Sequence, residues 1–120
     1  MSYDELCSAA REAALLESIE ALLNWDERTY MPEQAGPYRA EQITYLAGKI
    51  HHLRTDARLG DWLAELRSSP LASDPHSDSG TTIRQLARDY EKRKKLPAKL
   101  VEALAREAVL GQQAWVGARK

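Results

Sequence analysis

The sequence predicts an all-α protein of about five helices, arranged as antiparallel hairpins or a bundle. Alanine, leucine, glutamate and arginine dominate, phenylalanine is absent and β-branched residues are sparse, a composition that favours helices. Apolar residues recur at steps of three and four along most of the chain, and no alternating strand pattern occurs. Prolines and glycines separate the periodic segments, as turns between helices require.

Two helices are expected in the first half of the chain. The first covers residues 2–24, where Ser2 can cap it and Asp4 and Glu5 suit the positive end of its dipole. Its apolar stripe is densest near the C-terminal end, which we expect to be the most buried part: Leu15, Leu16, Ile19, Leu22 and Leu23. A second helix should begin near Pro37, with an inner face of Ile43, Leu46, Ala47, Ile50 and Leu53.

Three further helices are expected in the second half. Thr55 or Asp56 should begin the third, whose inner face is Leu59, Trp62, Leu63 and Leu66. Residues 68–80, SSPLASDPHSDSG, predict a flexible polar loop. The fourth helix should cover residues 81–95, with Ile83, Leu86, Ala87 and Tyr90 inward. Pro97 should end it and seat the first turn of the fifth, whose apolar stripe is Leu100, Val101, Leu104, Ala108 and Trp115.

The bulk composition indicates one soluble helical domain over residues 1–120, since 43% apolar and 29% charged residues are ordinary for a globular protein. A net charge of −1 argues against nucleic acid or an anionic membrane as a partner. The single cysteine, Cys7, excludes an internal disulfide framework and fits a reducing compartment. No apolar run could span a bilayer, and the acidic N-terminus is unlike a signal peptide. We therefore expect a cytoplasmic location.

The three histidines offer a weak metal signal. His51 and His52 are adjacent, so on a helix they diverge by about 100° and cannot chelate one ion together. His52 and Asp56 have the i, i+4 spacing of two ligands on one face, but a zinc site needs three or four. We expect all three histidines, His76 included, to be solvated or capping.

Other candidate chemistry also has a plainer interpretation. Cys7 is read as a buried small hydrophobe rather than a reactive thiol. The basic run Glu91–Lys95 is read as a solvated helix end with an i, i+4 ion pair between its first and last residues, not as a nucleic-acid patch. P-loop, Rossmann, G-x-S-x-G and H-E-x-x-H patterns are absent from the sequence. Spacing alone therefore predicts no catalytic, cofactor-binding or metal residue in this chain.

The stretch NWDERTYMPEQ, Asn24–Gln34, interrupts the helical pattern. Trp25 carries a large ring whose N–H needs a partner, and Asp26 can accept a hydrogen bond or cap the following turn. One interpretation is a helix–helix corner whose aromatic rings plug the end of the core, and the other is a ligand loop. The residues by themselves favour the corner plug.

Several stretches have a counterpart in one enzyme family. They are YDEL at Tyr3–Leu6, LLESIEALLNWDERTYMP at Leu15–Pro32, G-x-x-R-A-E-Q at Gly36 and Arg39–Gln42, YLAGKIHHLRTDARLGDWLAEL at Tyr45–Leu66, RDYEKRKKLPAKLVEALAR at Arg88–Arg106 and QQAWVGAR at Gln112–Arg119. WD-x-x-TYMP followed by RAEQ is the most specific part. In this order the stretches make the chain similar to the N-terminal region of the carboxypeptidase Taq family of metallocarboxypeptidases.

This resemblance implies a largely helical metalloprotease that removes C-terminal residues from peptides with a divalent metal, typically zinc and sometimes cobalt. In the family, two histidines of an H-E-x-x-H helix and a downstream glutamate hold the metal, and the motif glutamate activates the bound water. These elements lie far C-terminal to the region that matches. The resemblance thus implies an N-terminal domain without the catalytic region, either expressed as a piece or encoded by a truncated gene, and inactive alone. Its expected partner is the remainder of the peptidase.

The resemblance also implies that this helical region caps a deep substrate groove. Its possible groove or cap residues are Trp25, Asp26, Tyr30, Met31, Pro32 and Arg39. Helices that pack on a larger body should leave apolar surface exposed, which favours a homo-oligomer. The alternative function is a free-standing helical interaction module without peptidase activity, whose docking face would be the last-helix stripe from Leu100 to Trp115.

Overall fold

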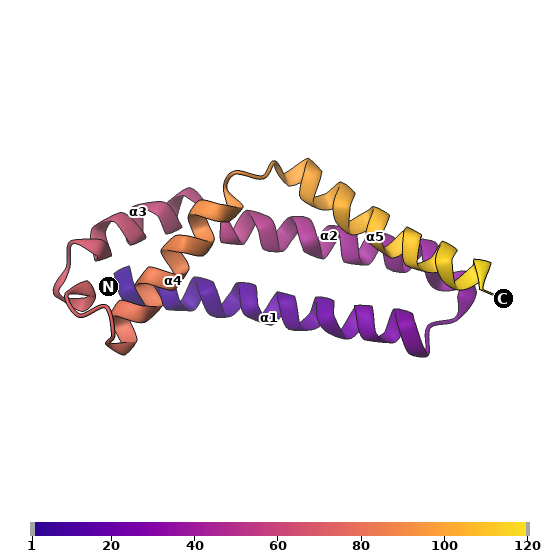
Figure 1. Ribbon diagram of the computed structural model, residues 1–120, viewed down its shortest axis with the longest axis horizontal. Helices are drawn as coiled ribbons and strands as arrows, with labels where there is room; N and C mark the ends of the chain where they lie inside the picture. Colours follow the sequence, from indigo (N-terminus) through magenta and orange to yellow (C-terminus); the bar gives the residue numbers. More distant parts are fainter. Residues whose placement is uncertain (1, 120) are drawn as a thin grey trace. The chain divides into compact units, whose positions relative to one another are not determined.

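The computed structural model describes residues 2–119, whose regular structure is all helical (Figure 1). The helices are α1 (Ser2–Thr29), η1 (Glu33–Ala35), α2 (Gly36–Arg54), α3 (Ala57–Arg67), η2 (Pro70–Ala72), α4 (Asp78–Arg93) and α5 (Ala98–Ala118), of which η1 and η2 are single 3₁₀ turns. The predicted fold class is confirmed. Within this range no helix combines the length and the apolar character needed to cross a membrane.

The contacts divide the chain into two compact units. The first unit combines the residues up to Ala13 with His52–Leu96, and the second combines Ala14–His51 with the residues from Pro97 onward. Helices α1 and α2 therefore each contribute to both units. The expectation of one domain over the whole chain stays a prediction.

The core of the first unit is formed by α1, α3 and α4. Its buried side chains are Leu6, Leu59, Leu63, Leu66, Ile83 and Ala87. Trp62, Leu86 and Tyr90 pack against them while staying partly exposed. The predicted inner faces of the third and fourth helices are thus confirmed. Each fully buried leucine or isoleucine contributes on the order of 1.5–3 kcal/mol of transfer free energy.

Asp56 begins α3 as its N-cap, which decides between the two predicted start residues. The Asp56 carboxylate accepts hydrogen bonds from the backbone N–H of Arg58 at 2.9 Å and from the Arg58 guanidinium at 3.0 Å. These bonds stabilise the ionised carboxylate, and they hold the pKa of Asp56 below its ordinary value of 3.8.

The segment 68–80 holds more regular structure than predicted. It contains the 3₁₀ turn Pro70–Ala72, and α4 begins at Asp78, before the predicted start at Thr81. Ser77 causes the earlier start, because its hydroxyl accepts a hydrogen bond from the backbone N–H of Gly80 at 3.0 Å. The Ser79 hydroxyl also donates to the Leu71 carbonyl oxygen at 2.7 Å. The predicted flexibility of this segment stays a prediction.

The second unit is built from the C-terminal part of α1, most of α2, and α5. Its buried cluster is Ala40, Ile43 and Val109, against which Leu23 of α1 packs. The Gln113 side chain donates to the Gly36 carbonyl oxygen at 3.0 Å. The Glu102 side chain lies where a Cβ on Gly48 would stand. These two contacts show that α5 runs antiparallel to α2.

The structure corrects two predictions about α1. The helix continues to Thr29 rather than ending near residue 24, so Asn24–Thr29 of the aromatic stretch is helical. Its apolar end is not the most buried part, since Leu15 and Leu22 are both 62% exposed and Ile19 is 41% exposed. Leu16 and Leu23 are half-buried instead. Neighbouring residues diverge by about 100° around a helix. In each pair of adjacent leucines, α1 therefore turns one side chain toward the protein (Leu16, Leu23) and leaves the other exposed (Leu15, Leu22).

The predicted apolar stripe of α5 is not the side that this helix buries. Leu100, Leu104 and Trp115 are 44%, 59% and 54% exposed, whereas Val109 is 4% exposed. Val109 lies on another side of the helix from the stripe, and that side packs on α2. The predicted helix is therefore present, and most of its apolar stripe is exposed. The side chain of Ser2, predicted to cap α1, lies outside the described residues.

Gly80, buried in the first turn of α4, is predicted not to tolerate a side chain. A Cβ at this position would collide with the backbone oxygen of Asp74, which cannot move without shifting the chain. We expect Gly80→Ala to lower the free energy of unfolding by about 1–3 kcal/mol, although alanine is the better helix former. Urea unfolding followed by circular dichroism measures this change.

Gly111 provides the matched control, because nothing lies within 4 Å of a Cβ built there. Gly111→Ala should raise the free energy of unfolding by up to about 1 kcal/mol through helix propensity alone. Equal effects of the two substitutions would contradict the close contact at Gly80.

The Asp56 cap predicts a pH-dependent stability. Asp56→Ala should lower the free energy of unfolding by about 1 kcal/mol at pH 7. Because the folded-state pKa lies below 3.8, the stabilisation is present above that value and is lost as pH falls through the folded pKa. The difference between wild type and variant should therefore shrink in acid, as measured by urea unfolding between pH 7 and pH 2.5 (roughly the window of carboxylate titration). Asp56→Asn caps without titrating and serves as the control.

Candidate functional site

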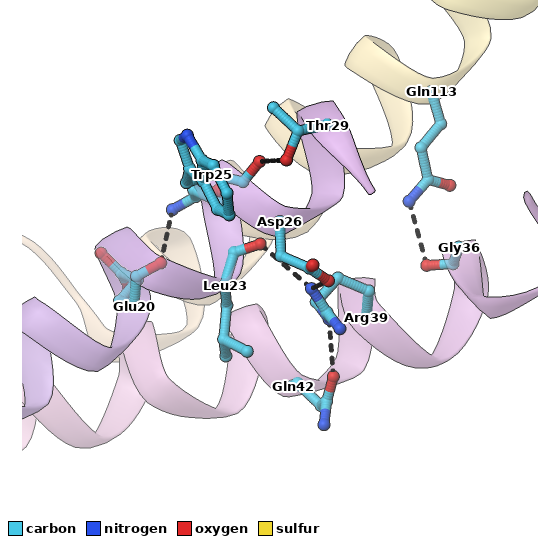
Figure 2. A network of polar contacts seen from close by, with 10 residues as sticks. Glu20, Leu23, Trp25, Asp26, Thr29, Gly36, Arg39, Gln42 and Gln113 are labelled. Carbon is cyan, nitrogen blue, oxygen red and sulfur yellow. Dashed lines mark hydrogen bonds and ion pairs between the residues drawn. The ribbon is translucent and has the colours of Figure 1, made fainter. Parts of the chain in front are cut away.

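The corner between α1 and α2 is the candidate site, and an ion pair joins two of its six predicted residues, one from each helix (Figure 2). Arg39 Nη1 lies 2.8 Å from the Asp26 carboxylate, forming an ion pair between α2 and α1. The same nitrogen donates to the Leu23 carbonyl oxygen at 3.1 Å. Arg39 Nε donates to the Gln42 side-chain oxygen at 2.8 Å. One guanidinium thus binds three acceptors from both helices.

The geometry makes Arg39 a bracing residue for the corner. Its side chain is only 16% exposed, and that of Asp26 is 35% exposed, so solvent screens the pair incompletely. Hydrogen bonds between charged groups are stronger than those between neutral groups. A cation near the C-terminal end of α1 is also favoured by the helix dipole. The brace therefore sets how the chain passes from α1 into α2.

The aromatic residues of the corner do not plug the core. Trp25 is 53% exposed and Tyr30 is 77% exposed, with their ring centroids 5.5 Å apart in a tilted pair. The prediction of a plug is wrong because the continued helix carries Trp25 to the outer side of α1, away from Leu23. Pro32 is also exposed and precedes the 3₁₀ turn at Glu33.

Met31, the remaining predicted residue, lines an open groove of about 580 Å³ in the second unit. The groove lies between the end of α1, the η1 turn and the C-terminal half of α5, and its lining combines carboxylates, one arginine, two amides and apolar side chains: Glu27, Arg28, Met31, Glu33, Leu110, Gln112, Gln113, Ala114, Val116 and Gly117. It brings together no nucleophile with an adjacent base.

Sequence reasoning overlooked part of the corner. Gln42 follows Arg39 at i+3, a spacing that places both side chains on one face of a helix and could have indicated their contact. The bond from Gln113 to Gly36 joins residues 77 positions apart and had no sequence signal. Figure 2 shows this bond entering the corner from α5.

The histidines divide into two groups. His52 and His76 are exposed, as predicted, but His51 is 5% exposed, so its expected solvation is wrong. His51 follows the buried residues Thr44 and Gly48 at steps of four and three, which places it on the inner face of α2. The Asp56 carboxylate that could have joined His52 at a metal is engaged by Arg58.

Cys7 and the basic run differ in detail from expectation. Cys7 is half-buried rather than fully buried. In the basic run, Lys94 Nζ pairs with the Glu91 carboxylate at 3.1 Å, an i, i+3 pair in place of the predicted i, i+4 pair with Lys95. The helix ends at Arg93, so Lys95 is beyond the helical spacing.

Comparison with known proteins identifies the family. The sequence model of the carboxypeptidase Taq (M32) metallopeptidase family matches residues 5–120. The chain belongs to this family. It is also 36% identical, over 118 residues, to thermostable carboxypeptidase 1 of Thermus thermophilus. That match covers 98% of the chain but only 23% of the relative's length, so the chain spans about a quarter of the carboxypeptidase that it resembles.

The metal implied by a metallopeptidase family does not fit the residues at hand. Within residues 2–119, no three His, Cys, Asp or Glu side chains gather closely enough to hold a metal ion. A zinc site in a protease requires three protein ligands. The described residues therefore do not supply the ligand set of such a site.

The brace predicts a graded response to substitution. Arg39→Ala removes the donor from Asp26, the Leu23 carbonyl and Gln42 together, and we expect the free energy of unfolding to fall by about 1–2 kcal/mol. Asp26→Asn keeps an acceptor oxygen of similar shape and should cost less than half as much. Chemical unfolding monitored by circular dichroism measures both. An Arg39→Ala variant as stable as wild type would rule out a bracing role.

Proposed function

We propose that this chain is the N-terminal helical domain of a metallocarboxypeptidase and is noncatalytic alone. The observation that carries the proposal is the coverage: almost the whole chain matches a carboxypeptidase of which it spans 23%. The full-length enzyme would remove C-terminal residues from peptides, with zinc or cobalt held by residues outside this segment. A cytoplasmic location is part of the proposal, supported by the single cysteine, which is unpaired.

The apolar surface supports a role as one part of a larger body. Five of the large apolar side chains on α1 and α5 are more than half exposed: Leu15, Leu22, Trp25, Leu104 and Trp115. Single exposed apolar residues are common, but a helix that repeats them along one face has the character of a packing surface. We infer that the remainder of the peptidase is the partner of such a surface in the full-length enzyme.

The corner would then act as a cap element beside the substrate groove. Arg39 and Asp26 brace the turn, and Met31 lines the open groove next to it. Trp25, Tyr30 and Pro32 are exposed around the same turn, which leaves them free to contact another part of the enzyme or its substrate. In this proposal Arg39 and Asp26 position the corner, and the exposed or groove-lining residues around it form its surface.

The test measures metal content and peptidase activity of the purified 120-residue chain. We expect less than about 0.1 equivalent of Zn²⁺ or Co²⁺ after dialysis, because a site with fewer than three ligands binds weakly. We also expect no hydrolysis of a blocked dipeptide with either metal added. The Thermus thermophilus carboxypeptidase in the same assay is the positive control. One bound metal per chain with chelator-sensitive turnover would overturn the proposal.

The exposed apolar stripe of α5, which includes Leu100, Leu104 and Trp115, also favours a second candidate function. This candidate is a free-standing helical interaction module. The DNA downstream of codon 120 discriminates between the two. An open frame that continues into an H-E-x-x-H motif supports the peptidase domain. A stop codon without a protease remnant supports the module.

A further inference from the structure

The outer face of α4 carries three exposed cations in a row, here named the α4 cationic stripe: Arg84, Arg88 and Lys92. They follow one another at steps of four residues, which keeps them on one side of the helix and about 6 Å apart along its axis. Ile83 and Ala87, which α4 buries in the core of the first unit, lie on another side. The stripe therefore takes no part in packing that core.

The carboxylates of α4 do not neutralise the stripe. Asp89 pairs with Arg93 at 2.9 Å, and Glu91 pairs with Lys94 at 3.1 Å. The remaining carboxylate, Asp78, lies in the first turn, where it suits the helix dipole. Among residues 2–119, no ion pair involves a member of the stripe. Its positive charge is therefore left to the solvent.

The arrangement of the stripe works against the helix that carries it. Like charges four residues apart on a helix repel each other, and the stripe contains two such pairs, Arg84 with Arg88 and Arg88 with Lys92. The helix dipole favours Lys92 in the last turn but gives no reason for the two arginines. A local rule that is broken without a compensating contact is the pattern expected of residues kept for function.

The rest of the exposed face narrows the class of anion that would bind. Every exposed residue along α4, all of which the structure describes, is polar or charged. The face thus has no apolar side chain to enter a lipid surface and no exposed ring to stack on the bases of a single-stranded nucleic acid. Exposed pairs with carboxylates contribute little free energy, so an acidic polypeptide would gain little from three of them. A chain of phosphates has a higher charge density and gains more, because its neutralisation releases condensed counterions.

We propose that the α4 cationic stripe binds a linear polyphosphate, with each of its three cations contacting a phosphate along one chain. The two guanidinium groups present forks of donors that match phosphate oxygens, and Lys92 adds an ammonium group. Lys95, exposed just beyond the end of the helix, extends the positive surface in the same direction. This inference goes beyond the proposed function, because it requires neither a metal nor the rest of the peptidase.

The first test is isothermal titration calorimetry of the purified 120-residue chain with inorganic polyphosphate at low salt. We expect a dissociation constant on the order of 100 µM, typical of weak electrostatic binding. The logarithm of the binding constant should fall against the logarithm of the salt concentration with a slope of about −2, as three phosphate contacts on a flexible strand predict. Orthophosphate, which is too short to reach two cations of the stripe, is the control. A chain that binds polyphosphate no better than orthophosphate would refute the proposal.

The variant Arg88→Glu reverses the charge at the centre of the stripe. It should weaken polyphosphate binding at least about tenfold, because one phosphate contact is lost and a carboxylate faces the ligand. The matched control is Arg106→Glu on α5, where an exposed arginine undergoes the same change of charge. The control should change the dissociation constant by less than about threefold, through net charge alone. Equal weakening in both variants would show that binding follows net charge rather than the stripe, against the proposal.

The same variant separates a binding role from a structural one. In Arg88→Glu the new carboxylate lies four residues from both Arg84 and Lys92, so two repulsive pairs become attractive. Without ligand, the variant should therefore resist urea at least as well as wild type, although it binds polyphosphate more weakly. A ligand-free variant that unfolds at lower urea would show that Arg88 is kept for the fold, and the argument for a binding role would fail.

Two other anions test the class of ligand. Poly-L-glutamate and a single-stranded oligonucleotide, compared at equal concentrations of anionic groups, should each bind at least about threefold more weakly than polyphosphate. Equal or stronger binding of poly-L-glutamate would assign the stripe to an acidic polypeptide. The same result with the oligonucleotide would assign it to a nucleic acid. Either outcome would overturn the assignment to polyphosphate.

Discussion

The candidate site depends on the hydrogen bonds and the ion pair made by the guanidinium of Arg39. It joins the Asp26 carboxylate and the Leu23 carbonyl of α1 to the Gln42 side chain of α2, with donor–acceptor distances between 2.8 and 3.1 Å. A planar group with several fixed donors suits this task better than an ammonium would. Without such a group, the carbonyl and the two side chains would have to rely on water at a partly buried corner.

The residues of the corner fall into a pair that holds the turn and a pair that is exposed to other contacts. Arg39 and Asp26 are occupied with each other, whereas Trp25 and Tyr30 project from the corner with more than half of their surface exposed. The partly buried polar contacts hold the backbone of the corner, and the exposed aromatic rings are left for other contacts. Aromatic rings with one polar atom are well suited to contacts with other polypeptides. The corner thus combines a braced turn with an accessible surface, the two features on which the proposed cap role rests.

The sequence predicted the helices better than the surfaces they bury. Periodicity identified the inner faces of α3 and α4, because both helices pack against each other within one local unit. For α5, periodicity identified the stripe that contains Leu104 and Trp115, which is exposed, and gave no indication that Val109 is buried. Periodicity shows which residues share a face, but whether that face is covered depends on neighbours elsewhere. Asp26 and Arg39 come from two successive stretches of the family signature, yet their pairing followed only from the fold. The bond between Gln113 and Gly36 depends on long-range packing alone.

Helix α1 runs without a break from the first unit into the second. A helix propagates cooperatively, since each added residue gains a hydrogen bond without a new nucleation cost. The cluster around Leu6 and the cluster around Leu23 are therefore anchored on one continuous backbone ladder. Fraying that starts in either cluster shortens the ladder available to the other. The two units consequently share part of their protection against solvent exchange, although their side-chain cores are separate.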